Sequence, residues 1–315
     1  MVTVPQLLVA GAVLTGLIAG PAMAADLARP LYRRPVAVVA PVYTWTGFYV
    51  GLNAGYTWSQ NSGVAVQGAN VFAPPGALGL TYGLAAAAGI SGVGFVRNDG
   101  FIGGGQVGYN WQFGGPVGPW GGAGFVAGVE ADIQGVAGGN HSSSYARAVD
   151  RLFPAPGINF IDSFVTVSKR LDYLGTVRGR LGYLVKPSLL AYATGGLAYG
   201  GARSETTYFG FENPPLGVGS TPFFGAAAFS NTRVGWTVGG GLEWMFMPNL
   251  SAKAEYLYYD LGSVTYASTT AAFALTTGNL RFIDAAQSST RFNGHVVRVG
   301  LNYKFNNYYA PLVTK

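Results

Sequence analysis

Residues 47–59 read GFYVGLNAGYTWS, and along this stretch apolar side chains alternate with small or polar ones. Phe48, Val50 and Leu52 share one face, whereas Tyr49 and Asn53 share the other. A period of two is typical of a β-strand with one apolar face. The alternating stretch is longer than the five or six residues of an ordinary strand. This length is typical of a strand that crosses a membrane.

Seven further segments repeat this alternation, at residues 101–113, 120–134, 166–185, 189–203, 232–247, 250–266 and 291–305. In the segment at 189–203 the pattern leaves open which face is apolar. Short connections lie at 114–118, 186–188 and 248–249, and long ones at 61–98, 136–165, 204–231 and 267–290. Short turns on one side and long loops on the other are typical of outer-membrane barrels. The pattern therefore predicts an all-β fold, an eight-stranded antiparallel transmembrane β-barrel with short periplasmic turns and long extracellular loops.

The composition favours a membrane protein. Charged residues make up only 10% of the 315 residues, against about 25% in soluble domains. After residue 24 no stretch offers the roughly 20 consecutive apolar residues of a membrane helix, so a closed barrel is the remaining way to pair every backbone group in lipid. A soluble β-sandwich also alternates, but long strands, charges on the polar face and aromatics near strand ends favour the barrel.

The ends of the chain lie outside the predicted barrel, which spans residues 46–305. Residues 1–24 have an apolar core at 7–19 and end in Ala-Met-Ala, which predicts a signal peptide cleaved between Ala24 and Ala25. The alternative is an N-terminal membrane anchor. Pro30, Pro35 and Pro41 predict that residues 25–45 form a Pro-rich periplasmic linker, and residues 306–315 form a C-terminal tail. The absence of cysteine fits an exported protein that does not rely on disulfides.

Strand parity places a set of charged side chains on the inner face of the barrel. The predicted lumen network contains five acids and five bases: Glu130, Asp132, Asp172, Glu243, Glu255, Arg178, Arg180, Lys253, Arg298 and Lys304. Buried charges need partners, and eight strands leave a lumen just wide enough to be filled by side chains. We therefore expect a salt-bridged plug. The alternative is a narrow charged path for ions or small solutes.

Catalytic and cofactor signals are weak. His141 lies beside three serines in a predicted loop, His295 points toward lipid by parity, and no metal-ligand spacing is present. Gly103, Gly105 and Gly108 match the dinucleotide fingerprint, but they lie within a strand, where that fingerprint does not function. We expect no cofactor. In the loops Phe223, Phe224 and Phe229 form either an exposed recognition surface or a cluster packed on itself.

Several stretches together resemble a known family: VYTWTGFYVGLNAGY, GFIGGGQVGYNWQF, GVEADIQG, LGTVRGRLGYLV, AYATGGLAYG, VGGGLEW, AKAEYLYYDLG and VVRVGLNYKF. They look like the small outer-membrane immunogenic proteins of alphaproteobacteria, porin-like barrels that resemble the OmpA transmembrane domain. The resemblance implies location in the outer membrane of a Gram-negative bacterium and contacts with its lipid and lipopolysaccharide. It also implies exposure to host or phage ligands. It further implies an assembly signal for the barrel-assembly machinery at Tyr303 and Phe305, although ten residues follow here.

We therefore expect a structural and surface-interaction barrel that serves envelope integrity and is a surface antigen. A weakly conducting porin-like channel is the alternative, and an outer-membrane enzyme is a distant third. The net charge of +6 does not indicate a nucleic-acid partner, because Lys and Arg are spread singly along strands and loops.

Overall fold

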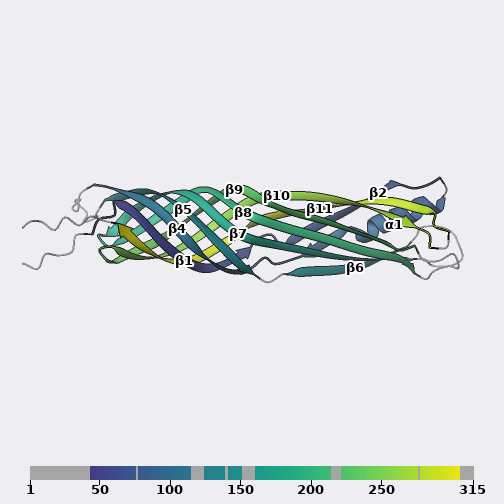
Figure 1. Cartoon of the computed structure of the whole chain (residues 1–315), viewed down its shortest axis with the longest axis horizontal. Helices are drawn as coiled ribbons and strands as arrows, with labels where there is room; N and C mark the ends of the chain where they lie inside the picture. Colours follow the sequence, from purple (N-terminus) through teal and green to yellow (C-terminus); the bar gives the residue numbers. More distant parts are fainter. Residues whose placement is uncertain are drawn as a thin grey trace, which may run out of the picture. The chain divides into compact units, whose positions relative to one another are not determined.

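A computed structural model of the chain describes residues 43–75, 77–114, 124–138, 141–150, 160–213, 221–275 and 277–305 (Figure 1). Within these ranges lie eleven strands and one helix: β1 (Gly47–Ser59), β2 (Gly63–Phe72), α1 (Ala77–Ile90), β3 (Gly92–Phe95), β4 (Gly100–Phe113), β5 (Phe125–Gly138), β6 (Ser142–Asp150), β7 (Phe160–Lys186), β8 (Leu189–Asn213), β9 (Phe223–Met247), β10 (Leu250–Phe273) and β11 (Leu280–Phe305).

Eight of the strands pair in a ring. The order is β1-β4-β5-β7-β8-β9-β10-β11, and β11 pairs back onto β1 from Phe48↔Phe305 to Ser59↔Gly294. All pairings are antiparallel. These eight strands correspond to the eight predicted segments, so the predicted antiparallel barrel is confirmed.

The prediction of eight strands in total is corrected, because β2, β3 and β6 lie in segments predicted as loops. Strands β7 to β11 are also longer than expected, at 24–27 residues each. They continue through the predicted loops at 204–231 and 267–290, where Ala, Ser, Thr and Phe still alternate between buried and exposed positions. About ten residues are enough to cross the bilayer, so the upper halves of these strands extend beyond it.

Aromatic side chains on the outer face mark the membrane-spanning part of the barrel. A lower girdle consists of Phe48, Trp111, Phe113, Phe125, Tyr183, Trp244, Tyr303 and Phe305, and an upper girdle consists of Trp58, Tyr173, Tyr199, Trp236, Tyr256 and Tyr258. Between Phe48 and Trp58 lie ten steps along β1, which matches the length of a tilted transmembrane strand. Outward residues between the girdles, such as Leu52, Leu181 and Val299, are apolar and exposed.

Above the upper girdle the wall divides. β9 and β10 pair only up to Trp236↔Asp260, where β10 has an irregularity in register and Gly262 adopts a φ of +81°. Beyond this point β6-β7-β8-β9 and β10-β11-β2-β3 continue as two sheets. We call this region the extension (Figure 1, right).

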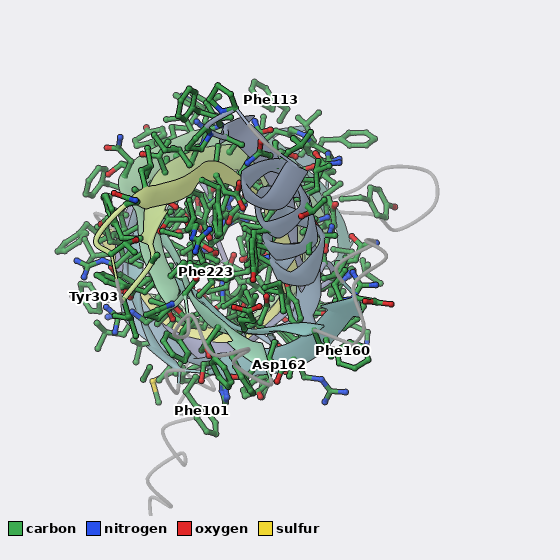
Figure 2. The ribbon with its side chains drawn as sticks, turned by 90° about the vertical axis from the view of Figure 1, so that its right-hand side faces the viewer. Phe101, Phe113, Phe160, Asp162, Phe223 and Tyr303 are labelled. Atoms are coloured by element: carbon green, nitrogen blue, oxygen red, sulfur yellow. The ribbon has the colours of Figure 1, made fainter. Side chains whose placement is uncertain are left out.

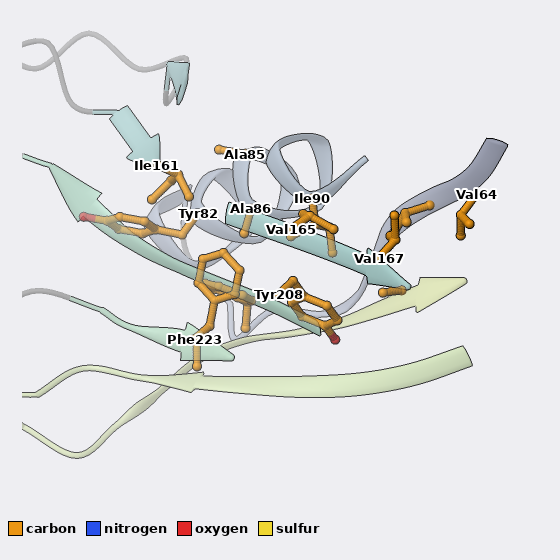
Figure 3. Packing of buried hydrophobic residues seen from close by; sticks show 14 of the residues in the cluster. Val64, Tyr82, Ala85, Ala86, Ile90, Ile161, Val165, Val167, Tyr208 and Phe223 are labelled. Atoms are coloured by element: carbon orange, nitrogen blue, oxygen red, sulfur yellow. The ribbon is translucent and has the colours of Figure 1, made fainter. Parts of the chain in front are cut away.

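Helix α1 fills the extension. It contacts β2 and β11 of one sheet and β6 and β7 of the other, and Figure 2 shows it nearly end-on within the outline of the strands. Its Tyr82, Ala86 and Ile90 pack with inward residues of the sheets such as Val165 and Phe223 (Figure 3). Because α1 closes an apolar core between the two sheets, the extension is a folded unit rather than a set of loops.

The topology predicts which surfaces are accessible from outside the cell. A cysteine replacing Ser142 on β6, which is exposed in the extension, is expected to react with a membrane-impermeant maleimide on intact cells. A cysteine replacing Lys186, which is exposed beside the short β7–β8 turn, is expected to react only after lysis. The opposite pattern of labelling would contradict the proposed orientation.

Some predicted features lie outside the described residues: the signal peptide and its cleavage site at Ala24 and Ala25, residues 25–42 of the linker, most of the turn at 114–118, the strand start at 120–123, and the tail at 306–315. Within the described part of the chain, no helix is both long and apolar enough to cross a membrane.

Candidate functional site

Nine of the ten predicted lumen residues lie together inside the membrane-spanning part of the ring. Each is at most 4% exposed: Glu130, Asp132, Arg178, Arg180, Glu243, Lys253, Glu255, Arg298 and Lys304. They project from β5, β7, β9, β10 and β11, because inward positions on neighbouring strands fall at the same level in the antiparallel register. We call these nine residues the lumen network.

Two arginines join the carboxylates of the network. Arg178 donates hydrogen bonds to Glu130 at 2.6 Å, Asp132 at 3.0 Å and Glu255 at 2.9 Å. Arg298 donates to Asp132 at 2.8 Å and to Glu255 at 2.7 Å. The guanidinium fork suits such contacts with several carboxylates. The two arginines therefore cross-link strands on opposite sides of the lumen.

A second group of contacts lies nearer the lower mouth. Arg180 donates to Glu243 at 2.5 Å and to the hydroxyl oxygen of Tyr49 at 3.1 Å, and Tyr49 donates to Glu130 at 2.7 Å. The Arg180 guanidinium also lies over the Tyr192 ring, 4.3 Å from its centroid. Since these bonds connect the two groups, the network forms one continuous layer across the barrel.

The lower mouth is covered by Trp45, whose side chain is fully buried. Its indole Nε1 donates to the carbonyl of Pro187 at 3.0 Å, and its backbone N–H donates to Gln112 at 2.9 Å. The Lys304 Nζ lies 3.5 Å from the centroid of the Trp45 ring and 3.7 Å from Glu243. The segment that precedes β1 therefore closes the barrel from below.

The prediction that Asp172 belongs to the lumen network is wrong. The register of β7 with β8 shifts between Leu171 and Leu174, so parity deduced from the lower half of β7 does not hold above this bulge. Leu171 turns inward and is buried, whereas Asp172 is partly exposed and bonds to Arg170 and Arg203. The network is left with four acids and five bases.

Sequence reasoning also missed neutral members of this layer. Asn53 donates to Gln106 at 3.1 Å, Gln106 to Asn302 at 2.5 Å, and Asn302 to Glu243 at 3.1 Å. Thr176 donates to Asp132 at 2.8 Å. All of them occupy inward positions, so strand parity predicts them in the same way as it predicts the charged residues.

Above the network the lumen is filled mainly by apolar side chains, with the buried polar residues Thr57, Gln134 and Thr237 among them. Ile102, Leu174, Leu257, Phe292 and Val296 are buried members of a cluster that fills the ring at the level of the upper girdle. Above this cluster the Lys169 Nζ donates to the carbonyls of Asn61 and Arg291 at 2.7 and 2.5 Å. Burial lowers the pKa of this lysine to about 8. The core around α1 follows, so side chains occupy the lumen at every level from Trp45 to α1.

The candidate catalytic residues are not brought together. His295 lies on the outer face of β11, stacked on Trp58 and bonded through Nδ1 to Tyr256 at 2.6 Å. His141 lies in the extension, just before β6. Gly103, Gly105 and Gly108 all lie within β4, not at a strand-to-helix turn. In the described ranges no group of three or more His, Cys, Asp or Glu side chains is arranged to hold a metal ion.

The three loop phenylalanines have different environments. Phe223 is buried and packs on Phe282, Phe229 stacks on Tyr266, and Phe224 is 79% exposed. Tyr303 and Phe305 lie on the outer face at the end of β11, and Phe305 contacts Phe48 across the β1–β11 pairing. The predicted assembly signal therefore lies in the lower girdle.

Comparison with known proteins agrees with this architecture. The family model described as "Outer membrane protein beta-barrel domain" matches residues 10–305. The "31 kDa outer-membrane immunogenic protein" of Brucella melitensis is 32% identical over 286 residues, covering 90% of this chain and 93% of that protein. The "22 kDa outer membrane protein" of Rhizobium leguminosarum is 29% identical over 205 residues, covering 64% and 66%.

Among solved structures, the outer membrane protein OprG from Pseudomonas aeruginosa aligns with a TM-score of 0.38 and 10% identity, covering 85% of this chain and all of that one. Neisserial surface protein A aligns with a TM-score of 0.31 and 11% identity, covering 82% and 98%.

Proposed function

The chain belongs to the outer membrane protein β-barrel domain family and is an outer-membrane protein, and from that premise we propose that it is a structural and surface-interaction barrel with a closed lumen. Its extension presents a folded surface outside the cell, and its membrane-spanning part strengthens the envelope. The proposal includes no enzymatic activity. Contacts with lipopolysaccharide and with host or phage ligands belong to the same proposal.

The filled lumen is the observation that carries this proposal. Trp45, the lumen network, the apolar cluster around Phe292 and the α1 core succeed one another along the axis of the barrel. Buried charges in the network are paired rather than arranged along an open wall. A conducting path would have to pass both the charged layer and two mainly apolar layers, where an ion would lose its hydration.

Conductance in planar bilayers tests the proposal. We expect the full-length protein to give no stable, ohmic channels. As a matched pair, Trp45→Ala removes the cover of the lower mouth, whereas Trp244→Ala removes an exposed indole from the lower girdle. Neither variant is expected to conduct, because the lumen network and the apolar layers remain. Stable wild-type channels whose ion selectivity changes in Arg180→Ala would favour the porin-like alternative.

Assembly supplies a further prediction. We propose that Tyr303 and Phe305 act as the signal read by the barrel-assembly machinery, since they are outward aromatics at the end of the last strand. Phe305→Ala is expected to reduce the amount of heat-modifiable barrel several-fold. Truncation after Phe305 should leave it near the wild-type amount. If truncation were the more damaging change, the signal would lie in residues 306–315 instead.

A further inference from the structure

We propose that Arg170 and Arg203 form a binding site for the phosphate of an outer-leaflet lipid, with the lipid A part of lipopolysaccharide as its occupant. The inference rests on the orientation in the proposed function, which places the extension outside the cell. It assigns a role to Asp172, which the bulge in β7 turns away from the lumen network.

Arg170 and Arg203 place two like charges next to each other on neighbouring strands. They lie directly opposite each other in the β7–β8 register, on the outer face. Like charges in directly opposite positions destabilise a sheet, so such a pair needs an anion. Asp172 supplies one, because its two carboxylate oxygens each lie 2.7 Å from the Nε of one arginine. The shared carboxylate fixes the orientation of both guanidinium groups from below.

Both arginine side chains keep part of their surface exposed beside their contacts with Asp172. The side chains of Arg170 and Arg203 are 38% and 56% exposed. They line a groove of about 420 Å³ on the outer face, together with Ser168, Glu205, Ala228 and Ser230. Planar guanidinium groups bind phosphate oxygens through paired hydrogen bonds, and serine hydroxyls beside them can donate as well. The groove therefore has the chemistry of a phosphate site.

The position of the groove selects a lipid phosphate rather than a soluble one. Arg203 lies four residues above Tyr199 of the upper girdle on β8, about 13 Å along the strand before tilt is considered. This is the level of lipid headgroups, since girdle aromatics lie at the membrane–water interface. Arg170 lies a similar distance above Tyr173, on the other side of the bulge.

The wall below the groove has room for acyl chains. Gly179 and Gly195 face each other across β7 and β8, and the nearest atoms to their ideal Cβ positions lie 3.9 and 3.5 Å away. An acyl chain of a lipid whose phosphate binds the arginines can therefore lie against this pair of glycines.

Substitution of Glu205 is expected to change the affinity for the lipid phosphate in the opposite direction to loss of the arginines. Its carboxylate lines the same groove and repels a phosphate, so Glu205→Gln should strengthen binding, whereas loss of the arginines should weaken it. Arg97, an exposed arginine between β3 and β4, is the matched control because it lies outside the groove.

The experiment measures binding of diphosphoryl lipid A, the same lipid after enzymatic dephosphorylation, and inorganic phosphate to the full chain in detergent micelles. We expect Arg170→Ala/Arg203→Ala to weaken lipid A binding at least tenfold, Glu205→Gln to strengthen it several-fold, and Arg97→Ala to leave it unchanged. Dephosphorylated lipid should bind wild type as weakly as lipid A binds the double variant. If the double alanine variant does not fold, Arg170→Lys/Arg203→Lys keeps the charge and is expected to lose severalfold affinity.

Two results would overturn the proposal. The first is equal affinity of wild type and the arginine variants for diphosphoryl lipid A. The second is competition by inorganic phosphate at the concentrations at which the lipid itself binds, which would indicate a site for a free anion. Neither result bears on the closed lumen, which conductance tests separately.

Discussion

Arg178→Met is expected to lower the free energy of unfolding of the barrel by about 3–5 kcal/mol. Arg178 bonds to Glu130, Asp132 and Glu255 at once, and its side chain is 1% exposed. Removing it leaves three carboxylates in the lumen with fewer cations than the native network provides. Methionine has a similar length, so the loss measures charge pairing more than packing. Urea unfolding of the barrel in vesicles, followed by tryptophan fluorescence, measures the change.

The control for Arg178 is an ion pair outside the lumen. Arg291→Met breaks the bond between a half-exposed arginine and Asp260, and a smaller loss of stability is expected because solvent screens the charge of this arginine. Combining Arg178→Met with Glu255→Gln should cost less than the sum of the two single changes, since the second removes one of the negative charges that the first leaves less compensated. A loss below about 1 kcal/mol for Arg178→Met would mean that the network is solvated, as in a pore.

The membrane-spanning barrel was predictable from sequence because every strand there alternates with a fixed period. Inward charges on β5, β7, β9, β10 and β11 follow from that parity, and their proximity follows from antiparallel register. Asp172 was assigned wrongly because a bulge shifts parity by one residue without a local marker in the sequence. The same bulge brings Asp172 between Arg170 and Arg203 on the outer face, so the wrongly assigned residue belongs to the proposed phosphate site.

The extension was not predictable in the same way. Helix α1 reads ALGLTYGLAAAAGI, which has three glycines, no polar face and no acidic residue in its first turn. The exposed face of α1 carries Leu80 and Leu84 rather than polar side chains, so the usual sequence signal for a surface helix is missing. β2, β3 and β6 pair with strands distant in sequence or with a neighbour across a long connection. Their register depends on tertiary packing rather than on local pattern.

The stability of the extension is expected to fall as pH rises from about 4 to about 7, because of Asp284 on β11. Its carboxyl is fully buried, and burial raises its pKa to about 7. Oδ1 accepts a hydrogen bond from Asn70 at 2.8 Å, whereas Oδ2 is buried without a hydrogen-bond partner. In the unfolded chain an aspartate has a pKa near 3.9. Between these two values the unfolded state is ionised while the folded state must keep its proton.

The folded state therefore binds more protons than the unfolded state in this window, and stability decreases with pH until the folded pKa is passed. Over the whole window, the free energy of unfolding is expected to fall by about 2–4 kcal/mol. The upper value follows because the two pKa values differ by about three units and each unit corresponds to about 1.36 kcal/mol. Because Asn70 also packs against Gly83 of α1, hydrogen exchange of α1 amides at pH 5 and pH 8, corrected for intrinsic rates, reports the loss. Asp284→Asn should remove the pH dependence, whereas Asp150→Asn, at an exposed acid on β6, should retain it. Identical protection of α1 at both pH values in the wild-type protein would show that Asp284 is ionised, and compensated, in the folded extension.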